Sequence, residues 1–188
     1  MTTAVQLASS PALLTADEFA RRHGGDCVEL IDGVVQELPV PHQRHGFVNF
    51  RAAFLIGEFV VAKDLGRITT NDSFVQTRSA PDRVRGADVC FFSWERLPRG
   101  KMPDGLLPVS PDLIIEVRSP SQGWDSMLAK VAEYLAVSVR AVVVLDMNVH
   151  SAAVYRKDEL QQVFDNGDNL TLPDILPGFS VPVRKFFD

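Results

Sequence analysis

Hydrophobic residues fall into short runs along the chain, and the spacing of each run predicts a secondary-structure element. The first run, LLTADEFARRHGG at 13–25, has the pattern of a short helix. Thr15 is its expected N-cap, Glu18 is placed to close a capping box, and the glycine pair at its end predicts the C-terminus. A hairpin is expected next at 27–38, because its two apolar runs flank an Asp-Gly dipeptide.

The central part of the chain predicts one long helix and several strands. The stretch 45–66, HGFVNFRAAFLIGEFVVAKDLG, is apolar on more than one side, so we expect a largely buried helix that ends at Gly66. Three strand-like runs follow it: RITT at 67–70, SFVQTR at 73–78 and GADVCFFS at 86–93. A charged loop from Glu95 to about Ser110 comes next.

The second half of the chain predicts a crossover unit. Strand DLIIEV at 112–117, a helix at 125–137 and strand RAVVVLD at 140–146 form the order strand, helix, strand, which is typical of a right-handed βαβ unit. An antiparallel hairpin at 151–164 and a terminal element at 176–187 complete the chain. We therefore expect one α/β domain over 1–188, a mixed central sheet flanked by helices with hairpins at both ends, and a flexible segment at 1–12.

Composition narrows the function classes. The chain has 188 residues, 46% hydrophobic and 23% charged, and a formal net charge of -5. This balance argues against a protein that coats nucleic acid or anionic membrane without specificity. The segment 78–101 nevertheless carries six basic and three acidic residues, so a local basic patch is expected.

Cysteine content and the chain start indicate the compartment. Cys27 and Cys90 belong to no metal-binding or disulfide pattern, so we expect both to be small core residues. The first residues lack a basic leader, and no uninterrupted apolar run reaches 18 residues. A cytoplasmic protein without membrane association is therefore expected.

Two acids interrupt runs that otherwise predict buried strands. Glu116 lies inside PDLIIEVRSP, and Asp88 stands at the head of the run 89–92. A buried carboxylate costs several kcal/mol unless it is paired or bound to a cation. If the two strands are neighbours, a shared divalent cation or a raised pKa relieves the repulsion, and Mg²⁺ suits such oxygen ligands.

Basic residues near these acids leave alternatives open. Lys130 lies one turn before Tyr134 on the flank of the predicted helix, where it can reach the acids and where burial can lower its pKa. The buried stripe of that helix is expected to comprise Met127, Leu128, Val131, Tyr134 and Leu135. Ion pairs of the acids with Arg118 or Arg85 are the structural alternative, and Lys130 could equally be an ordinary solvated lysine.

The ordered series ELIDG, His45 at the head of a helix, ADVCFF, PDLIIEVRSPS, K...YL and LPGF resembles a known family. It is similar to a large prokaryotic family of domains with the restriction-endonuclease fold, within the PD-(D/E)XK nuclease superfamily. The resemblance runs from about Leu14 to the C-terminus. It implies a restriction-endonuclease-like core and a metal-dependent phosphodiesterase site.

Carried over residue by residue, the resemblance implies that Asp88, Glu116 and the carbonyl of Val117 hold the metal. The lysine of the superfamily motif is replaced by Arg118, which cannot act as a base because its guanidinium stays protonated. Lys130 is therefore expected to supply the catalytic lysine from the next helix. His45 and, more weakly, Glu29 are further catalytic candidates.

The resulting expectation is an endonuclease dependent on Mg²⁺ or Mn²⁺ that acts on DNA, with Arg118 and Arg85 as candidate phosphate contacts. A homodimer is expected by analogy with nucleases of this fold. The alternative is a non-catalytic nucleic-acid-binding or protein-interaction module on the same fold. A metal-dependent hydrolase of a smaller phosphate ester is a third possibility.

Overall fold

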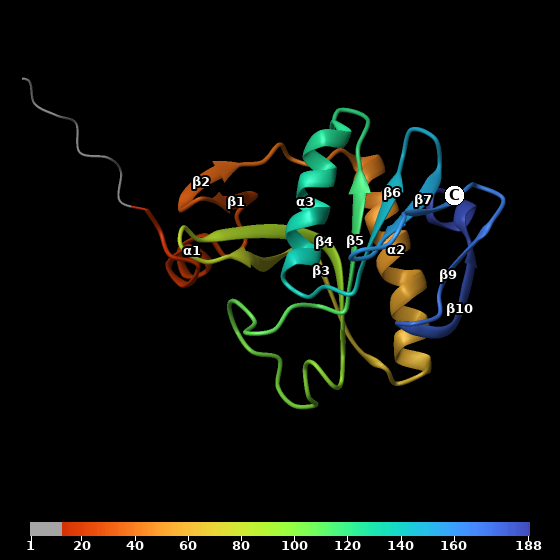
Figure 1. The fold of residues 1–188 in the computed structure, drawn as a ribbon, viewed down its shortest axis with the longest axis horizontal. Coiled ribbons are helices and arrows are strands. Elements are labelled where there is room, and N and C mark those ends of the chain that lie inside the picture. Colours follow the sequence, from red (N-terminus) through yellow and green to blue (C-terminus); the bar gives the residue numbers. More distant parts are fainter. Residues whose placement is uncertain (1–12) are drawn as a thin grey trace, which may run out of the picture.

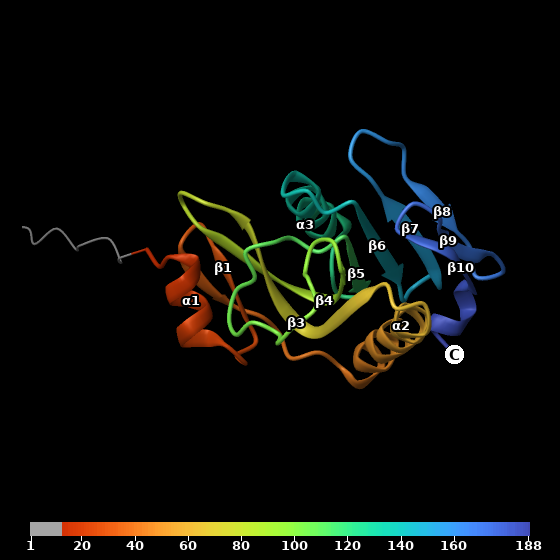
Figure 2. The ribbon, with the colours of Figure 1, turned by 90° about the horizontal axis from the view of Figure 1, so that it is seen from below.

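The structure is a computed structural model that describes residues 13–188, so the flexible segment expected at 1–12 lies outside the described residues. Its centre is an eight-stranded mixed sheet in the order β2-β1-β4-β5-β6-β7-β8, with β3 paired to β4. Figure 2 shows α2 and α3 on opposite sides of this sheet. The mixed α/β architecture expected from the sequence is therefore confirmed.

The N-terminal predictions hold in detail. Helix α1 (Ala16–His23) is capped by Thr15, whose hydroxyl accepts a hydrogen bond from the Glu18 amide while the Glu18 carboxylate accepts from the Thr15 amide. Strands β1 (Val28–Ile31) and β2 (Val34–Glu37) form the expected hairpin. Asp32 and Gly33 both have positive φ, as a type I′ turn requires.

The two strand-like runs before Asp88 form a single strand. Strand β3 (Gly66–Arg78) runs antiparallel to β4 (Arg83–Ser93), and their register shifts between Thr70 and Ser73. Asn71 and Asp72 have positive φ at this shift, which identifies a β-bulge. The polar residues between the two runs therefore bend the strand without ending it.

The crossover unit follows the prediction. Strand β5 (Leu113–Arg118), helix α3 (Trp124–Ala136) and strand β6 (Ala141–Asp146) are consecutive, and β5 and β6 pair in parallel. The core contact of α3 is narrower than expected: Met127, Val131 and Tyr134 are buried, whereas Leu128 is 42% exposed. Leu128 lies about 100° around the helix from Met127 and so points away from the sheet.

Helix α2 (Gln43–Ala62) is not buried on more than one side, which corrects the expectation from its composition. Its contact face consists of Val48, Ala52, Ile56 and Val60, which pack against the face of the sheet opposite α3. By length and mean hydropathy alone, α2 is the one helix of the described residues that could cross a membrane. In the fold, one side of it covers the sheet.

The C-terminal part forms two hairpins. Strands β7 (Ser151–Tyr155) and β8 (Gln162–Phe164) extend the main sheet, as expected. Strands β9 (Asn169–Leu172) and β10 (Leu176–Pro182) then form a separate two-stranded sheet, where the sequence patterns predicted only a terminal element. The 3-10 helix η1 (Val183–Phe186) follows and, like β10, contacts α2 (Figure 1).

Candidate active site

The candidate site lies where one edge of β4 changes its neighbour. Near its start, β4 pairs with β1 through Val84, and further along it pairs with β5 from Val89 onward. Between these ladders the backbone of 85–88 has no strand partner on this edge. Buried backbone groups need hydrogen bonds, so side chains from the bordering strands and helices enter this gap.

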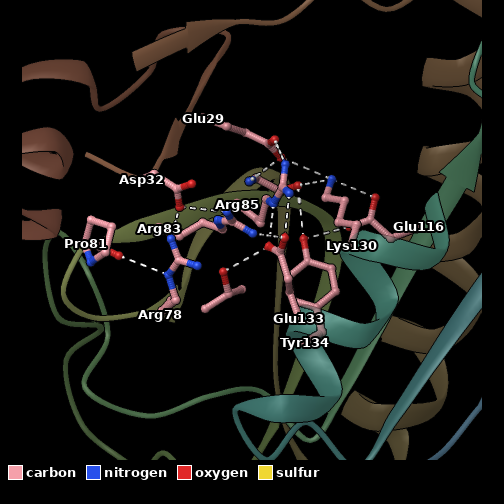
Figure 3. Close-up of polar contacts among 12 residues, drawn as sticks. Glu29, Asp32, Arg78, Pro81, Arg83, Arg85, Glu116, Lys130, Glu133 and Tyr134 are labelled. Carbon is pink, nitrogen blue, oxygen red and sulfur yellow. Dashed lines mark hydrogen bonds and ion pairs between the residues drawn. The ribbon is translucent and has the colours of Figure 1, made fainter. Parts of the chain in front are cut away.

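Glu29 enters the gap from β1. Its carboxylate is buried, accepts a hydrogen bond from the Gly86 amide at 3.2 Å and another from Arg85 at 2.7 Å, and lies 3.4 Å from the Lys130 ammonium. Figure 3 shows Glu29 joined to both basic side chains. The carboxylate therefore replaces a missing ladder partner of β4 and faces the charged centre of the gap.

Asp88 lies at the other end of the gap and connects β4 to β5. Its Oδ2 accepts from the Val117 amide at 2.7 Å, and its Oδ1 accepts from Asn49 of α2 at 3.0 Å. His45 of α2 lies 3.6 Å from Oδ2, and its Nε2 is 3.0 Å from the Val117 carbonyl. Burial raises the pKa of Asp88 to about 6, although the Lys130 charge and the Val117 amide oppose this shift.

Glu116 projects from β5 toward α3. Its two oxygens accept from Lys130 at 3.0 Å and from the Tyr134 hydroxyl at 2.9 Å. Burial raises the pKa of Glu116 to about 7 against the attraction of Lys130, and the negative charge of Asp88 adds to the rise. The two predicted acids therefore lie in one buried, electrostatically connected region.

Lys130 reaches the centre of the gap from α3. Its ammonium donates to the Gly86 carbonyl at 2.7 Å as well as to Glu116. Burial acts to lower the pKa of Lys130, but the charges of Glu116, Glu29 and Asp88 outweigh it and raise the pKa above its usual value. This corrects the expectation of a lowered pKa: the nearby acids keep this lysine protonated.

The two arginines predicted to contact phosphate are engaged with carboxylates. Arg118 donates to Asp146 at 2.9 Å and lies over the Trp124 ring at 4.6 Å. Arg85 binds Glu29 and makes a bidentate contact with Glu133 at 2.7 and 2.8 Å. A phosphate would have to compete with these partners. Glu116 pairs with Lys130, so the alternative pairing of Glu116 with Arg118 is not formed.

Three further side-chain groups belong to the site without having been predicted from the sequence: the Asn49 amide, the Tyr134 hydroxyl and the Glu133 carboxylate. Asn49 follows His45 by four residues on α2, and Tyr134 follows Lys130 by four on α3. Residues four positions apart share a helix face, so this spacing is a sequence signal for both Asn49 and Tyr134. Glu133 offered no comparable signal, since its role depends on Arg83 and Arg85 from β4 (Figure 3).

The donor set can be compared with the needs of a metal ion. Within residues 13–188 no three His, Cys, Asp or Glu side chains gather as metal ligands. Asp88, Glu116 and the Val117 carbonyl offer oxygen donors only, and each carboxylate oxygen retains a free lone pair beside its hydrogen bond. Mg²⁺ typically takes one or two carboxylates and completes its shell with water, so these residues fit a hard cation.

Comparisons with known proteins bear on the family and the fold. A family described as "Uma2: Putative restriction endonuclease" matches residues 16–184. The chain is also similar to the crystal structure of a "putative nuclease belonging to DUF820" from Anabaena variabilis, with a TM-score of 0.78 at 21% identity over 93% of this chain and 97% of that one. No curated protein matches the sequence. The restriction-endonuclease-like fold expected from the sequence is thus confirmed.

Proposed function

Because the chain belongs to the Uma2 family, whose description is "putative restriction endonuclease", we propose that it is a divalent-metal-dependent nuclease. The proposed reaction is hydrolysis of phosphodiester bonds in DNA. The observation that carries this proposal is the gap in the edge of β4, where Asp88, Glu116 and Lys130 meet. Three charged groups from separate elements lie there in a buried region, and all three are held close to one another by hydrogen bonds to strand backbone or to each other.

Asp88, Glu116 and the Val117 carbonyl are the residues that would hold a cation. Both acids have raised pKa values, and a nearby positive charge would favour their ionised forms. A bound Mg²⁺ or Mn²⁺ supplies charge neutralisation at the scissile phosphate and a lower pKa for a coordinated water. Phosphoryl transfer depends mainly on such positioning and electrostatic stabilisation.

Lys130 acts in this proposal as a fixed positive charge. A protonated ammonium cannot take a proton from water, but it can stabilise charge that develops on phosphate oxygens. Its bonds to Glu116 and the Gly86 carbonyl fix its position before substrate arrives. His45 Nε2 orients the Val117 carbonyl, and Asn49 orients the Asp88 carboxylate.

A DNA duplex has two strands, and we propose that two copies of the protein act on it together.

The basic segment 78–101 contributes little free charge to DNA binding, because Arg83 and Arg85 are paired with acids. Arg78 and Arg99 are exposed but also paired, with Asp32 and Asp64, so Lys101 is the basic side chain of that segment most open to a phosphate backbone.

Cleavage of linear and supercoiled DNA in Mg²⁺ or Mn²⁺ tests the proposal. The unmodified protein should cleave with either metal and stop in a chelator, and Asp88→Asn and Glu116→Gln should each lower the single-turnover rate by ~100-fold or more. Asp104→Asn is the matched control, since this acid is exposed in the 95–110 loop. It should cleave at the unmodified rate.

The alternatives give different results in the same assay. A non-catalytic binding module would shift DNA on a gel without cleaving it in any metal. A hydrolase of smaller phosphate esters would cleave a dinucleotide as fast as a long strand. Either result would overturn the proposed nuclease activity.

A further inference from the structure

The outer face of α2 exposes an unusual number of large apolar side chains. Phe47, Phe50, Phe54 and Val61 are 44, 62, 46 and 77% exposed, and the rings of Phe50 and Phe54 stack at 6.0 Å. Figure 2 shows α2 at the lower margin of the fold, with its far side turned away from the sheet. Contiguous apolar surface of this kind marks an interaction site.

The spacing of these residues indicates what they contact. Phe47, Phe50, Phe54, Gly57 and Val61 follow one another at intervals of three, four, three and four residues. This is the a and d pattern of a helix that packs lengthwise on another helix. Gly57 interrupts the row of large side chains, and a Cβ there would lie 3.8 Å from the Ile68 side chain of β3, so it lies at the edge of the row nearest the sheet.

We propose that this face binds the same face of a second copy of the chain, with the two α2 helices antiparallel and a two-fold axis at Phe54. Phe54 then meets Phe54 of the partner subunit. In that register Phe47 lies opposite the partner's Val61, and Phe50 lies within one residue of the partner's Gly57. Each large ring faces a smaller residue except on the axis, so the row complements itself.

Charge supports the antiparallel arrangement. Arg51 and Glu58 lie on the same flank of the apolar row, three residues before and four residues after Phe54. Antiparallel pairing places Arg51 beside the partner's Glu58 twice, once on each side of the axis. A parallel pair would place this flank against the opposite flank of the partner helix, away from the partner's Arg51 and the partner's Glu58, and would form neither ion pair. Within the described residues Glu58 makes no ion pair of its own.

The size of the contact predicts a weak dimer. The row from Phe47 to Val61 spans about 21 Å of helix at 1.5 Å per residue. One helix pair of this length lies at the low end of specific interfaces, so we expect reversible association in the micromolar range. Concentration should therefore change the oligomeric state.

The arrangement has a consequence that rests on the proposed function. His45 and Asn49, near the N-terminal end of α2, contact the Asp88 site. Antiparallel α2 helices would place one site near each end of the helix pair, about 27 Å apart along its axis. Two copies could then act on the two strands of one duplex.

Cysteine cross-linking tests the register without any activity measurement. In a Cys27→Ala background, Phe54→Cys should form a disulfide-linked dimer on mild oxidation, because this position lies on the axis. Val61→Cys is the matched control: it is more exposed, but its two copies would lie about 21 Å apart, too far for a disulfide. Efficient cross-linking at both positions, or at neither, would overturn the antiparallel register.

Sedimentation of charge variants tests the same interface in solution. Glu58→Arg should weaken the dimer at least tenfold, and the double variant Arg51→Glu with Glu58→Arg should restore it. Phe54→Asp should give a monomer with unchanged circular dichroism. If the unmodified protein stays monomeric to 200 μM, roughly a hundred times a typical micromolar Kd, the proposal fails. Binding of that monomer to phospholipid vesicles would assign the face to a membrane surface instead.

Discussion

At the scale of single residues, the site is governed by the burial of charge. Glu116 and Asp88 are buried, and their pKa values rise to about 7 and about 6. Lys130 is also buried, yet its pKa rises because three acids face it. The protonation state of each group therefore depends on the balance between its burial and the opposite charges around it.

The raised acid pKa values predict how stability depends on pH. In the window from about pH 4 to about pH 7, the folded protein binds more protons at Glu116 and Asp88 than the unfolded chain, so its unfolding free energy falls as pH rises. Each acid contributes up to about 1.4 kcal/mol per pH unit where it alone titrates. In metal-free buffer, Glu116→Gln should show a shallower fall than the unmodified protein in chemical unfolding at pH 5, 6, 7 and 8.

Asp104→Asn provides the control for that experiment, because this acid is exposed and should keep the unmodified slope. Identical slopes for Glu116→Gln and the unmodified protein would mean that Glu116 ionises at its ordinary pKa. The attraction of Lys130 would then balance the effect of burial on this pKa.

At the scale of elements, much of the fold could be predicted. The capping box of α1, the Asp-Gly hairpin and the β5, α3, β6 unit follow from local patterns that act over a few residues. The exposed face of α2 could not be predicted, because composition does not say which side of an apolar helix meets the sheet. The single strand β3 could not be predicted either, because the polar pair Asn71-Asp72 at its bulge has the composition of a turn.

Helix α3 and strand β5 each supply a basic residue near Glu116, and replacing the one should affect a different property from replacing the other. Lys130→Ala should lower single-turnover cleavage by ~100-fold or more with little change in DNA affinity, as expected for a charge that acts in the transition state. Arg118→Ala should instead lower the thermal unfolding temperature, because it leaves Asp146 buried without its partner. Stopped-flow cleavage and calorimetry separate the two effects. A folded Arg118→Ala protein that binds DNA but does not cleave it would contradict this prediction and assign the catalytic charge to Arg118 of β5.

At the scale of the whole molecule, the site exists only because of strand order. Glu29, Asp88 and Glu116 are far apart in sequence, and they meet because β4 pairs first with β1 and then with β5. Asp88 and Glu116 could be singled out in the sequence because each interrupts an apolar run, and the family resemblance implied that both hold the metal. The gap between the ladders that brings these side chains together is itself a tertiary feature without a local signal.

The central claim is that Asp88 and Glu116 together form a cation site, and calorimetric titration with Mn²⁺ at pH 8 tests it most directly. The account predicts one bound ion per chain in the unmodified protein and in Asp104→Asn. Asp88→Asn should abolish this binding, because Glu116 and the Val117 carbonyl alone make a poor site for a hard cation. Unchanged Mn²⁺ binding by a folded Asp88→Asn protein would contradict the account.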